Sequence, residues 1–221
     1  MNQGLSTFES SLKMPILELP VKSFLVKAKD GLVLISPVPD IQRFKPQIDA
    51  MGTLSDLVAP NGYHHLGMAQ AIELFPKATV WGVPALREKC ADISWEKDLF
   101  CDEWPYDDEL KAIALQGAPK LDEVVFFRET SKCLIVTDLC FNHIHGKGLG
   151  YWIMFNIFGA YKRFAMSRLL TQMVKDKELF RASLEKVLAL DFETIALPHG
   201  VNLSQNAKVR LRTALQERGL I

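Results

Sequence analysis

The feature that most constrains the fold is an apolar hairpin followed by alternating strand and helix patterns. Residues 21–27 (VKSFLVK) and 32–35 (LVLI) flank an Asp30-Gly31 step, which is a strong signal for a β-hairpin. Helical spacing of apolar residues follows over 40–51 and stops at Gly52. A chain that begins with an antiparallel pair and continues with strand–helix units is expected to form a mixed sheet with helices on both faces, which is an α/β layered domain.

The remaining elements continue this alternation. Strands are predicted over 54–59, 79–83, 111–116, 123–127, 133–137 and 194–197. Helices are predicted over 66–75 and 84–90, through most of 149–188, and after Asn202 or Ser204 to the end, whereas 91–109 is acidic and irregular. Since there is no internal repeat, low-complexity tract or Gly/Ser linker, we predict one domain over 1–221, with a helical insertion over about 142–190.

Composition and charge exclude some classes of function. The chain has 221 residues, of which 48% are hydrophobic and 24% charged, and this is ordinary for a globular protein. The 26 basic side chains are balanced by 26 acidic ones, so no electrostatic argument favours nucleic-acid binding. The most apolar stretch, 149–160 (LGYWIMFNIFGA), is shorter than the ~20 residues that span a bilayer, so we expect no transmembrane segment.

The stretch 149–160 and the cysteines bear on location. A buried or lid-forming helix is the simplest interpretation of 149–160, and a membrane-facing or partner-facing helix is the alternative, because Tyr, Trp and Phe suit an interface. The 4 cysteines form no CxxC pair, which predicts free thiols in a reducing compartment. Because the start of the chain (MNQGLSTFESS) lacks the pattern of a signal peptide, we expect a cytoplasmic protein.

Histidines and an aspartate follow three of the predicted strands. His64 and His65 come after the strand over 54–59, across a Pro-Asn-Gly-Tyr turn. Asp138 ends the strand over 133–137, and His199 follows the strand over 194–197. Loops at strand ends collect ligand-binding groups in α/β sheets, and imidazole and carboxylate groups are ligands of Zn²⁺ and Fe²⁺. Each residue alone is more often a surface or capping residue, so it is the joint pattern that indicates a metal site.

Three segments of the sequence resemble the metallo-β-lactamase superfamily. They are LVAPNGYHHLGMAQAIELFPKATVWGVPAL, DEVVFFRETSKCLIVTDLCFN and IALPHG, preceded by an SPV step at 36–38. The Ala-Pro-Asn turn before the paired histidines is the most specific of these motifs. The branch that it resembles is catalogued as a domain of unknown function, and the resemblance covers about 21–201. It implies a four-layer αββα sandwich with a metal site at one edge of its two sheets.

The resemblance also implies that the metal site is degenerate. Active members carry an HxHxDH run, a later histidine, a bridging aspartate and a last histidine. Pro60 and Gly62 stand at the first two histidines, and the middle histidine falls near Pro119, so the ligands of the first metal are absent. The residues that remain for the second metal are His64, His65, Asp138 and His199. The resemblance thus implies one divalent ion, Zn or Fe, held by three imidazoles and one carboxylate, with a metal-free site as the alternative.

Four further residues are candidate accessory groups. Asn61 and Tyr63 could be polar groups at the mouth of the site. His143 and His145 lie shortly after Asp138 and could be extra ligands, proton carriers or surface residues, of which a surface position is the simplest.

Three functions remain open from the sequence. The first is a mononuclear metal-dependent hydrolase that acts on a small molecule not identified by the sequence. The second is a non-catalytic, metal-free binding module on the same fold. The third is a redox protein with iron at the same site. A closed set of four protein ligands is more typical of a structural metal, which weighs against catalysis.

Overall fold

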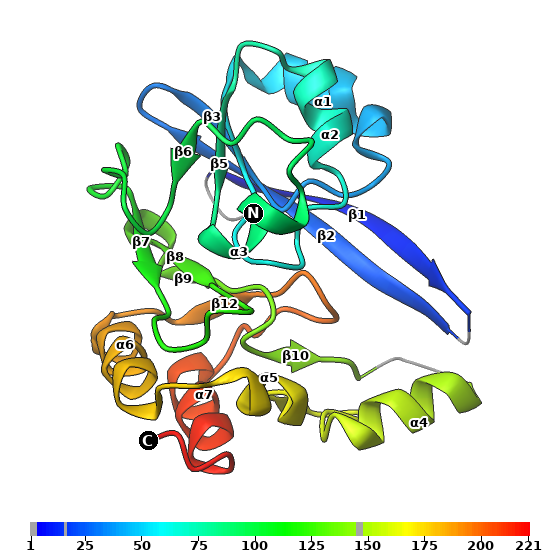
Figure 1. The fold of residues 1–221 in the computed structure, drawn as a ribbon, viewed down its shortest axis with the longest axis vertical. Coiled ribbons are helices and arrows are strands. Elements are labelled where there is room, and N and C mark those ends of the chain that lie inside the picture. The colour runs from blue at the N-terminus through cyan, green and yellow to red at the C-terminus, as the bar shows by residue number, and fades with distance from the viewer. Residues whose placement is uncertain (1–3, 16, 145–147) are drawn as a thin grey trace.

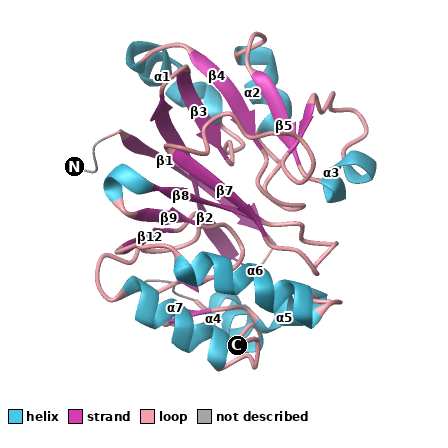
Figure 2. Cartoon of the chain, turned by 90° about the vertical axis from the view of Figure 1, so that its left-hand side faces the viewer, coloured by secondary structure: helices cyan, strands magenta, loops and turns pink. Residues whose placement is uncertain are grey.

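The protein consists of two sheets packed face to face with helices on both outer sides. The computed structural model describes residues 4–15, 17–144 and 148–221. Figure 1 and Figure 2 show α1 and α2 covering one side of the strands and α6 and α7 covering the other. The predicted four-layer αββα sandwich is therefore confirmed.

The first sheet combines an antiparallel and a parallel part. Its order is β1 (Leu5–Met14), β2 (Leu17–Ala28), β3 (Gly31–Ile35), β4 (Leu54–Val58), β5 (Thr79–Gly82) and β6 (Lys97–Asp98). The predicted hairpin is present as β2 and β3, which pair antiparallel with Phe24 opposite Ile35. The strands from β3 to β6 are parallel. The predicted start of the hairpin at residue 21 was wrong, because β2 begins at Leu17 and pairs with β1 over most of its length.

The second sheet lies between the two larger hydrophobic clusters of the protein. Its order is β12 (Thr194–Ala196), β9 (Cys133–Ile135), β8 (Val124–Arg128) and β7 (Leu110–Ala114). Along β8, Val124 and Phe126 belong to the cluster shared with the first sheet, whereas Val125 and Phe127 belong to the cluster under α6 and α7. This alternation is the period of two expected for a strand that is buried on both faces.

The helical elements alternate with the strands along the chain. They are η1 (Ile41–Phe44), α1 (Lys45–Met51), α2 (Met68–Leu74), α3 (Pro84–Lys89), η2 (Glu129–Ser131), α4 (Leu149–Ile157), α5 (Arg168–Met173), α6 (Lys177–Ala189) and α7 (Ala207–Gln216). The predicted helical stretch over 149–188 is divided, because β11 (Phe164–Ala165) lies between α4 and α5 and pairs with β10 (Phe141–Asn142). Within the described ranges, no helix has the length and apolar character needed to cross a bilayer.

The topology brings four strand ends to one edge of the sandwich. In the first sheet, β3 and β4 are parallel and end in register, with Ile35 opposite Val58. In the second sheet, β9 and β12 are parallel and end with Ile135 opposite Ala196. The carboxyl ends of parallel strands meet at one edge, so the loops after β3, β4, β9 and β12 are placed to build a common site.

Candidate metal centre

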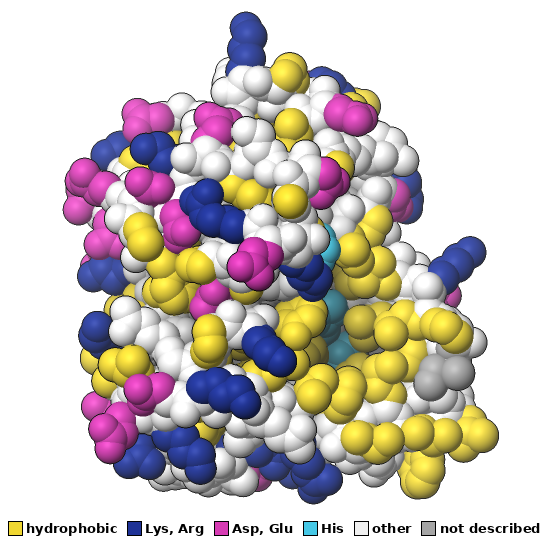
Figure 3. All heavy atoms as spheres, in the orientation of Figure 1, with side chains coloured by type: hydrophobic (Ala, Val, Ile, Leu, Met, Phe, Trp, Pro, Cys, Tyr) yellow, Lys and Arg dark blue, Asp and Glu magenta, His cyan; other side chains and the backbone are white. Residues whose placement is uncertain are grey.

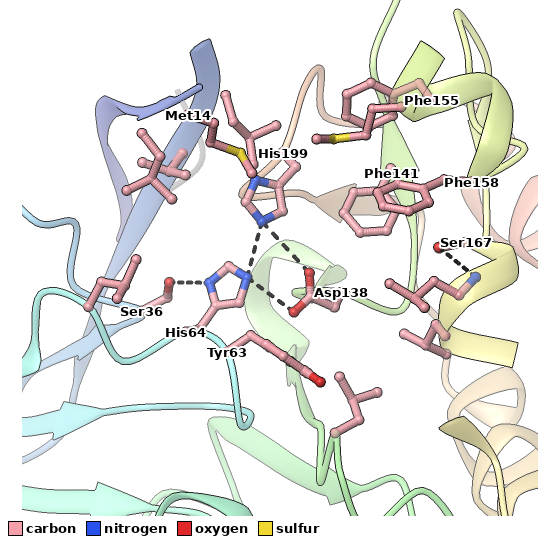
Figure 4. A pocket seen from close by; sticks show the side chains of 18 of the residues that line it. Met14, Ser36, Tyr63, His64, Asp138, Phe141, Phe155, Phe158, Ser167 and His199 are labelled. Carbon is pink, nitrogen blue, oxygen red and sulfur yellow. Dashed lines mark hydrogen bonds and ion pairs between the residues drawn. The ribbon is translucent and has the colours of Figure 1, made fainter. Parts of the chain in front are cut away.

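Three side chains from three of these loops converge. The Nε2 atom of His64 lies 3.5 Å from Oδ2 of Asp138 and 3.1 Å from Nε2 of His199, and His199 Nε2 lies 3.8 Å from Asp138 Oδ1. One ligand atom of each residue falls within 4.8 Å of the others. The three side chains are only 8%, 16% and 6% exposed, in the order His64, Asp138 and His199. Figure 4 shows them pointing toward one another, and we call them the His-Asp-His cluster.

Both histidines are oriented by bonds to their other ring nitrogen. His199 Nδ1 lies 3.1 Å from the carbonyl oxygen of Pro20, and a carbonyl can only accept, so Nδ1 carries the hydrogen. In neutral His199 the Nε2 lone pair is therefore free to bind a metal. His64 Nδ1 lies 2.6 Å from the hydroxyl of Ser36, which can accept or donate. Metal-binding histidines are commonly held in this way by a partner on the second nitrogen.

Ser36 occupies a strained position to make this contact. Its φ angle is 55°, in the left-handed region that non-glycine residues rarely adopt. The backbone is held there because the Ser36 N–H donates to the carbonyl of Val58 at the end of β4. Strain of this kind persists where surrounding contacts impose it, and it often marks a functional site.

Asn61 connects the loops that carry His64 and Asp138. Its side-chain amide donates to Asp138 Oδ2 (2.8 Å) and to the hydroxyl of Thr137 (3.0 Å). Its side-chain oxygen accepts the backbone N–H groups of Tyr63 (2.8 Å) and His64 (2.9 Å). The fully buried Asn61 thus fixes the turn after β4 against the end of β9.

Glu123 supports the same loop from behind. It is fully buried, and its two carboxylate oxygens accept the backbone N–H groups of Thr137 (2.7 Å) and Asp138 (3.1 Å). Burial, followed by the nearby charge of Asp138, raises the pKa of Glu123 to about 7. Glu123 and Ser36 were not among the predicted site residues.

The electrostatics of the cluster suit metal ligands. Burial would raise the pKa of Asp138, but the His64 and His199 rings and the Asn61 amide lower it to about 2. Burial and then the neighbouring His64 lower the pKa of His199 to about 4. Near pH 7 Asp138 is therefore ionised and His199 neutral, which are the protonation states that metal binding requires.

The predicted four-residue set is divided by the structure. His64, Asp138 and His199 lie together, whereas His65 is not a member of the cluster. The Nδ1 atom of His65 is buried without a hydrogen-bond partner. Burial, and next the charge of Lys89, lower the pKa of His65.

The four candidate accessory residues have different positions. Asn61 braces the cluster, as described above. Tyr63 lines the cavity in front of it, but its hydroxyl contacts the sulfur of Met173 at 3.8 Å. The surface position expected for His143 is wrong, because this residue is 3% exposed and its ring packs against Phe155 at 4.1 Å between centroids. His145 lies outside the described residues.

Gly200 is expected to be needed next to His199. Its φ angle is +94°, and a Cβ atom there would lie 2.3 Å from the carbonyl oxygen of Asn142. Gly148 has the same φ, and no atom of the described residues lies within 4 Å of such a Cβ, which makes Gly148 a matched control. We expect Gly148→Ala to cost about 1–3 kcal/mol through backbone strain and Gly200→Ala to cost more. Urea unfolding of both variants measures the difference, and equal costs would contradict the clash.

The cluster lies at the wall of an apolar cavity of about 390 Å³. Histidine side chains are visible in a hollow flanked by hydrophobic side chains in Figure 3. The lining includes Met14 and Leu19 of the β1–β2 hairpin and Met154 of α4, and the segment before and within α5 closes another side. This volume is in the range of small-molecule sites.

Comparison with known proteins identifies the fold. No protein-family model and no curated protein sequence matches the chain. Among solved structures, a metallo-β-lactamase from Pontibacter korlensis is 14% identical with a TM-score of 0.67, covering 98% of this chain and 96% of that chain. The DIM-1 metallo-β-lactamase, in a crystal exposed to ceftazidime, is 11% identical with a TM-score of 0.68, covering 97% and 94%. A metallo-β-lactamase from Erythrobacter litoralis is 14% identical with a TM-score of 0.67, covering 97% and 93%.

These likenesses extend over nearly the whole of each chain. The protein therefore has the metallo-β-lactamase fold. The resemblance indicated by the sequence is confirmed at the level of the fold, and the site combines that fold with a candidate metal centre of three residues.

Proposed function

We propose that the protein is a hydrolase with one divalent metal ion held by His64, Asp138 and His199. The observation that carries the proposal is the convergence of two Nε2 atoms and a carboxylate within 4.8 Å, each oriented by a bond from outside the cluster. Three protein ligands leave one position open, as in catalytic zinc sites, whereas structural sites are closed by four. A closed set of four protein ligands would weigh against catalysis. Because His65 is not in the cluster, this objection does not apply to the three-residue site.

The spacing of the donor atoms fits one ion. Bonds of about 2.0–2.2 Å in a tetrahedral arrangement would place ligand atoms about 3.3–3.6 Å apart. Nε2 of His64 lies 3.1 Å from Nε2 of His199 and 3.5 Å from Oδ2 of Asp138, which is close to this spacing. Two neutral imidazoles and one carboxylate would leave a divalent site with a net charge of about +1, which favours a bound hydroxide.

The metal ion and the surrounding residues would have different roles in hydrolysis. A bound ion would supply Lewis acidity, which polarises a carbonyl or phosphoryl oxygen and acidifies water. Asn61 holds Oδ2 of Asp138, so Oδ1 remains to accept a hydrogen bond from the attacking water. The apolar walls exclude bulk water and so strengthen these electrostatic interactions.

Zinc titration of the metal-free protein tests the proposal. Competition with a chromophoric chelator is expected to show one Zn²⁺ per chain, and elemental mass spectrometry of the purified protein checks the same stoichiometry. The loaded protein is then screened against ester, amide, lactone and phosphodiester substrates. Failure to bind Zn²⁺ or Fe²⁺ would overturn the hydrolase proposal and favour a metal-free binding module, in which one Nε2 donates to the other across 3.1 Å.

The ligand set also supports a second candidate function. Two histidines and one carboxylate with open positions are typical of non-haem Fe²⁺ oxygenases. Anaerobic loading with Fe²⁺ followed by nitric oxide distinguishes this function, because a nitrosyl complex gives a spin-resonance signal. Tight Fe²⁺ binding with that signal, and weak Zn²⁺ binding, would favour the redox protein over the hydrolase.

Ser36 is expected to affect metal affinity more than folding. Ser36→Ala removes the partner of His64 Nδ1, and loss of such a partner lowers metal affinity about 10–100-fold. The variant and the wild type are compared by Zn²⁺ affinity and, with chelator present, by urea unfolding. Unchanged affinity would show that His64 is oriented without Ser36.

We also propose that residues 1–221 form one domain in the cytoplasm. The second sheet contributes to the two larger hydrophobic clusters, so neither of these clusters is complete without it. The four cysteines are free, and Cys90, Cys133 and Cys140 are buried, which suits a reducing compartment.

A further inference from the structure

The cavity in front of the His-Asp-His cluster is polar at one side and apolar elsewhere. Ser36 and Tyr63 are near the cluster, and Ser167 is the other polar residue of the lining. The remaining walls are aliphatic, aromatic or methionine side chains: Leu12, Met14, Leu19, Val21, Pro37, Val38, Pro39, Leu66, Leu121, Phe141, Met154, Phe155, Phe158, Leu169, Leu170 and Met173. Figure 4 shows Phe141, Phe155 and Phe158 across the cavity from Ser36 and His64.

The charge of the lining restricts the ligand. Asp138 is the one acidic residue of the lining, and among the described residues no lysine or arginine lines the cavity. Phosphate groups are generally bound by arginine, lysine or a helix N-terminus, so a phosphoryl group would lack such partners here. A ligand that fits therefore has a small uncharged polar group at the cluster and an apolar remainder.

The mouth of the cavity is apolar as well. Met14, Leu66 and Leu169 line the cavity and are 40%, 56% and 43% exposed. An apolar ligand could therefore extend past the 390 Å³ interior without leaving hydrophobic contact. Met14, Met154 and Met173 are unbranched and adaptable, so the walls can follow a flexible chain.

From this arrangement we infer that the cavity binds the aliphatic chain of an uncharged acyl ester, with the ester carbonyl at the His-Asp-His cluster. The catalytic part rests on the proposed function, whereas binding of the chain does not. In the reaction, the oxygen of water bonds to the acyl carbon and the ester C–O bond breaks. One proton of water goes to the leaving alcohol and the other to the medium, and no oxidant is needed.

Displacement of an uncharged fluorescent probe measures chain binding without any reaction. N-phenyl-1-naphthylamine is bound to the protein and displaced by 1-alkanols from butanol to dodecanol, with Zn²⁺ and with chelator. Affinity is expected to rise by up to about fourfold per methylene until the cavity is filled. An affinity that does not depend on chain length would overturn the inference.

Two substitutions in α4 distinguish binding in the cavity from binding on the outer surface. Met154 lines the cavity, whereas Ile157, one turn further, is 64% exposed and does not. Met154→Asp is expected to weaken dodecanol binding at least tenfold, and Ile157→Asp to leave it within about twofold. Leu169 lines the exposed mouth, so Leu169→Asp is less able to disturb folding. This variant is also expected to weaken dodecanol binding. Equal effects of Met154→Asp and Ile157→Asp would place binding on the outer face and overturn the inference.

The two proposals fail in different ways. Chain-length-dependent displacement without metal binding would contradict the hydrolase and leave the acyl-chain site standing. Binding of one Zn²⁺ without chain-length dependence would contradict the acyl-chain site and leave the metal centre standing. If both hold, kcat/KM of the Zn²⁺-loaded protein should rise from p-nitrophenyl butanoate to the dodecanoate, and Met154→Asp should remove this rise.

Discussion

Asp138→Ala is expected to lower the affinity for Zn²⁺ by more than about a hundredfold. Loss of a residue that only orients a ligand already costs about 10–100-fold, and Asp138 is proposed as a ligand itself. It is also the one negative charge in the cluster, facing two imidazoles at 3.5 and 3.8 Å. Zn²⁺ affinity by chelator competition measures the effect, and His199→Ala should give a loss of similar size.

His65→Ala is the matched control for this loss. The cluster in the structure excludes His65, although this residue is adjacent to His64. We therefore expect His65→Ala to retain one Zn²⁺ with little change in affinity, and His64→Ala to lose it. Loss of Zn²⁺ in His65→Ala would instead support the four-ligand set, and retention in Asp138→Ala would contradict the proposed centre.

Most of the layered fold could be predicted because its inner strands are strongly apolar. The strands β4, β5, β8 and β9 are mostly buried, β8 and β9 as continuous hydrophobic runs, and the hairpin of β2 and β3 has a Gly31 turn. The strand β1 (Leu5–Met14) was missed for the opposite reason. Its sequence LSTFESSLKM is rich in serine and charge, and one residue in it, Phe8, is buried, so hydrophobicity gives a weak signal at this edge of the sheet.

The sequence predicted a metal site at the strand ends where the structure brings His64, Asp138 and His199 together, but it could not choose between adjacent side chains. His64 and His65 follow the same strand, and a spacing rule treats them alike. The choice depends on the turn, where Asn61 accepts the N–H groups of Tyr63 and His64 and so fixes the backbone. Ser36 was within the SPV step of the resemblance, yet its role follows from a contact across 28 positions of sequence.

The apolar segment after Asp138 shows a similar limit. The helix α4 is hydrophobic on both sides: Tyr151 and Phe155 are buried, whereas Leu149, Trp152 and Ile157 are exposed. A helix that is apolar all round gives no indication of which side faces the core. The structure resolves this, since Met154, Phe155 and Phe158 line the cavity in front of the cluster.

Glu123→Ala is expected to destabilise the metal-free protein by about 2–4 kcal/mol. The substitution leaves the backbone N–H groups of Thr137 and Asp138 without their carboxylate partner, and each buried unsatisfied group costs about 1–3 kcal/mol. Burying the carboxyl is itself costly, as its pKa of about 7 indicates, and the alanine variant recovers part of that cost. For this reason the expected loss lies below the sum of two full penalties.

Urea unfolding in the presence of chelator measures this loss without a contribution from metal. Glu129→Ala is the control, because Glu129 follows the same strand β8 but is exposed, and such surface changes usually stay within about 0.5 kcal/mol. The stability of Glu123→Gln should lie between those of Glu123→Ala and Glu129→Ala, since the glutamine amide keeps one acceptor oxygen. If Glu123→Ala were as stable as Glu129→Ala, the carboxylate would not anchor the Asp138 loop. If it is destabilised as expected, the same variant should also bind Zn²⁺ more weakly, because the loop that positions Asp138 has lost its support.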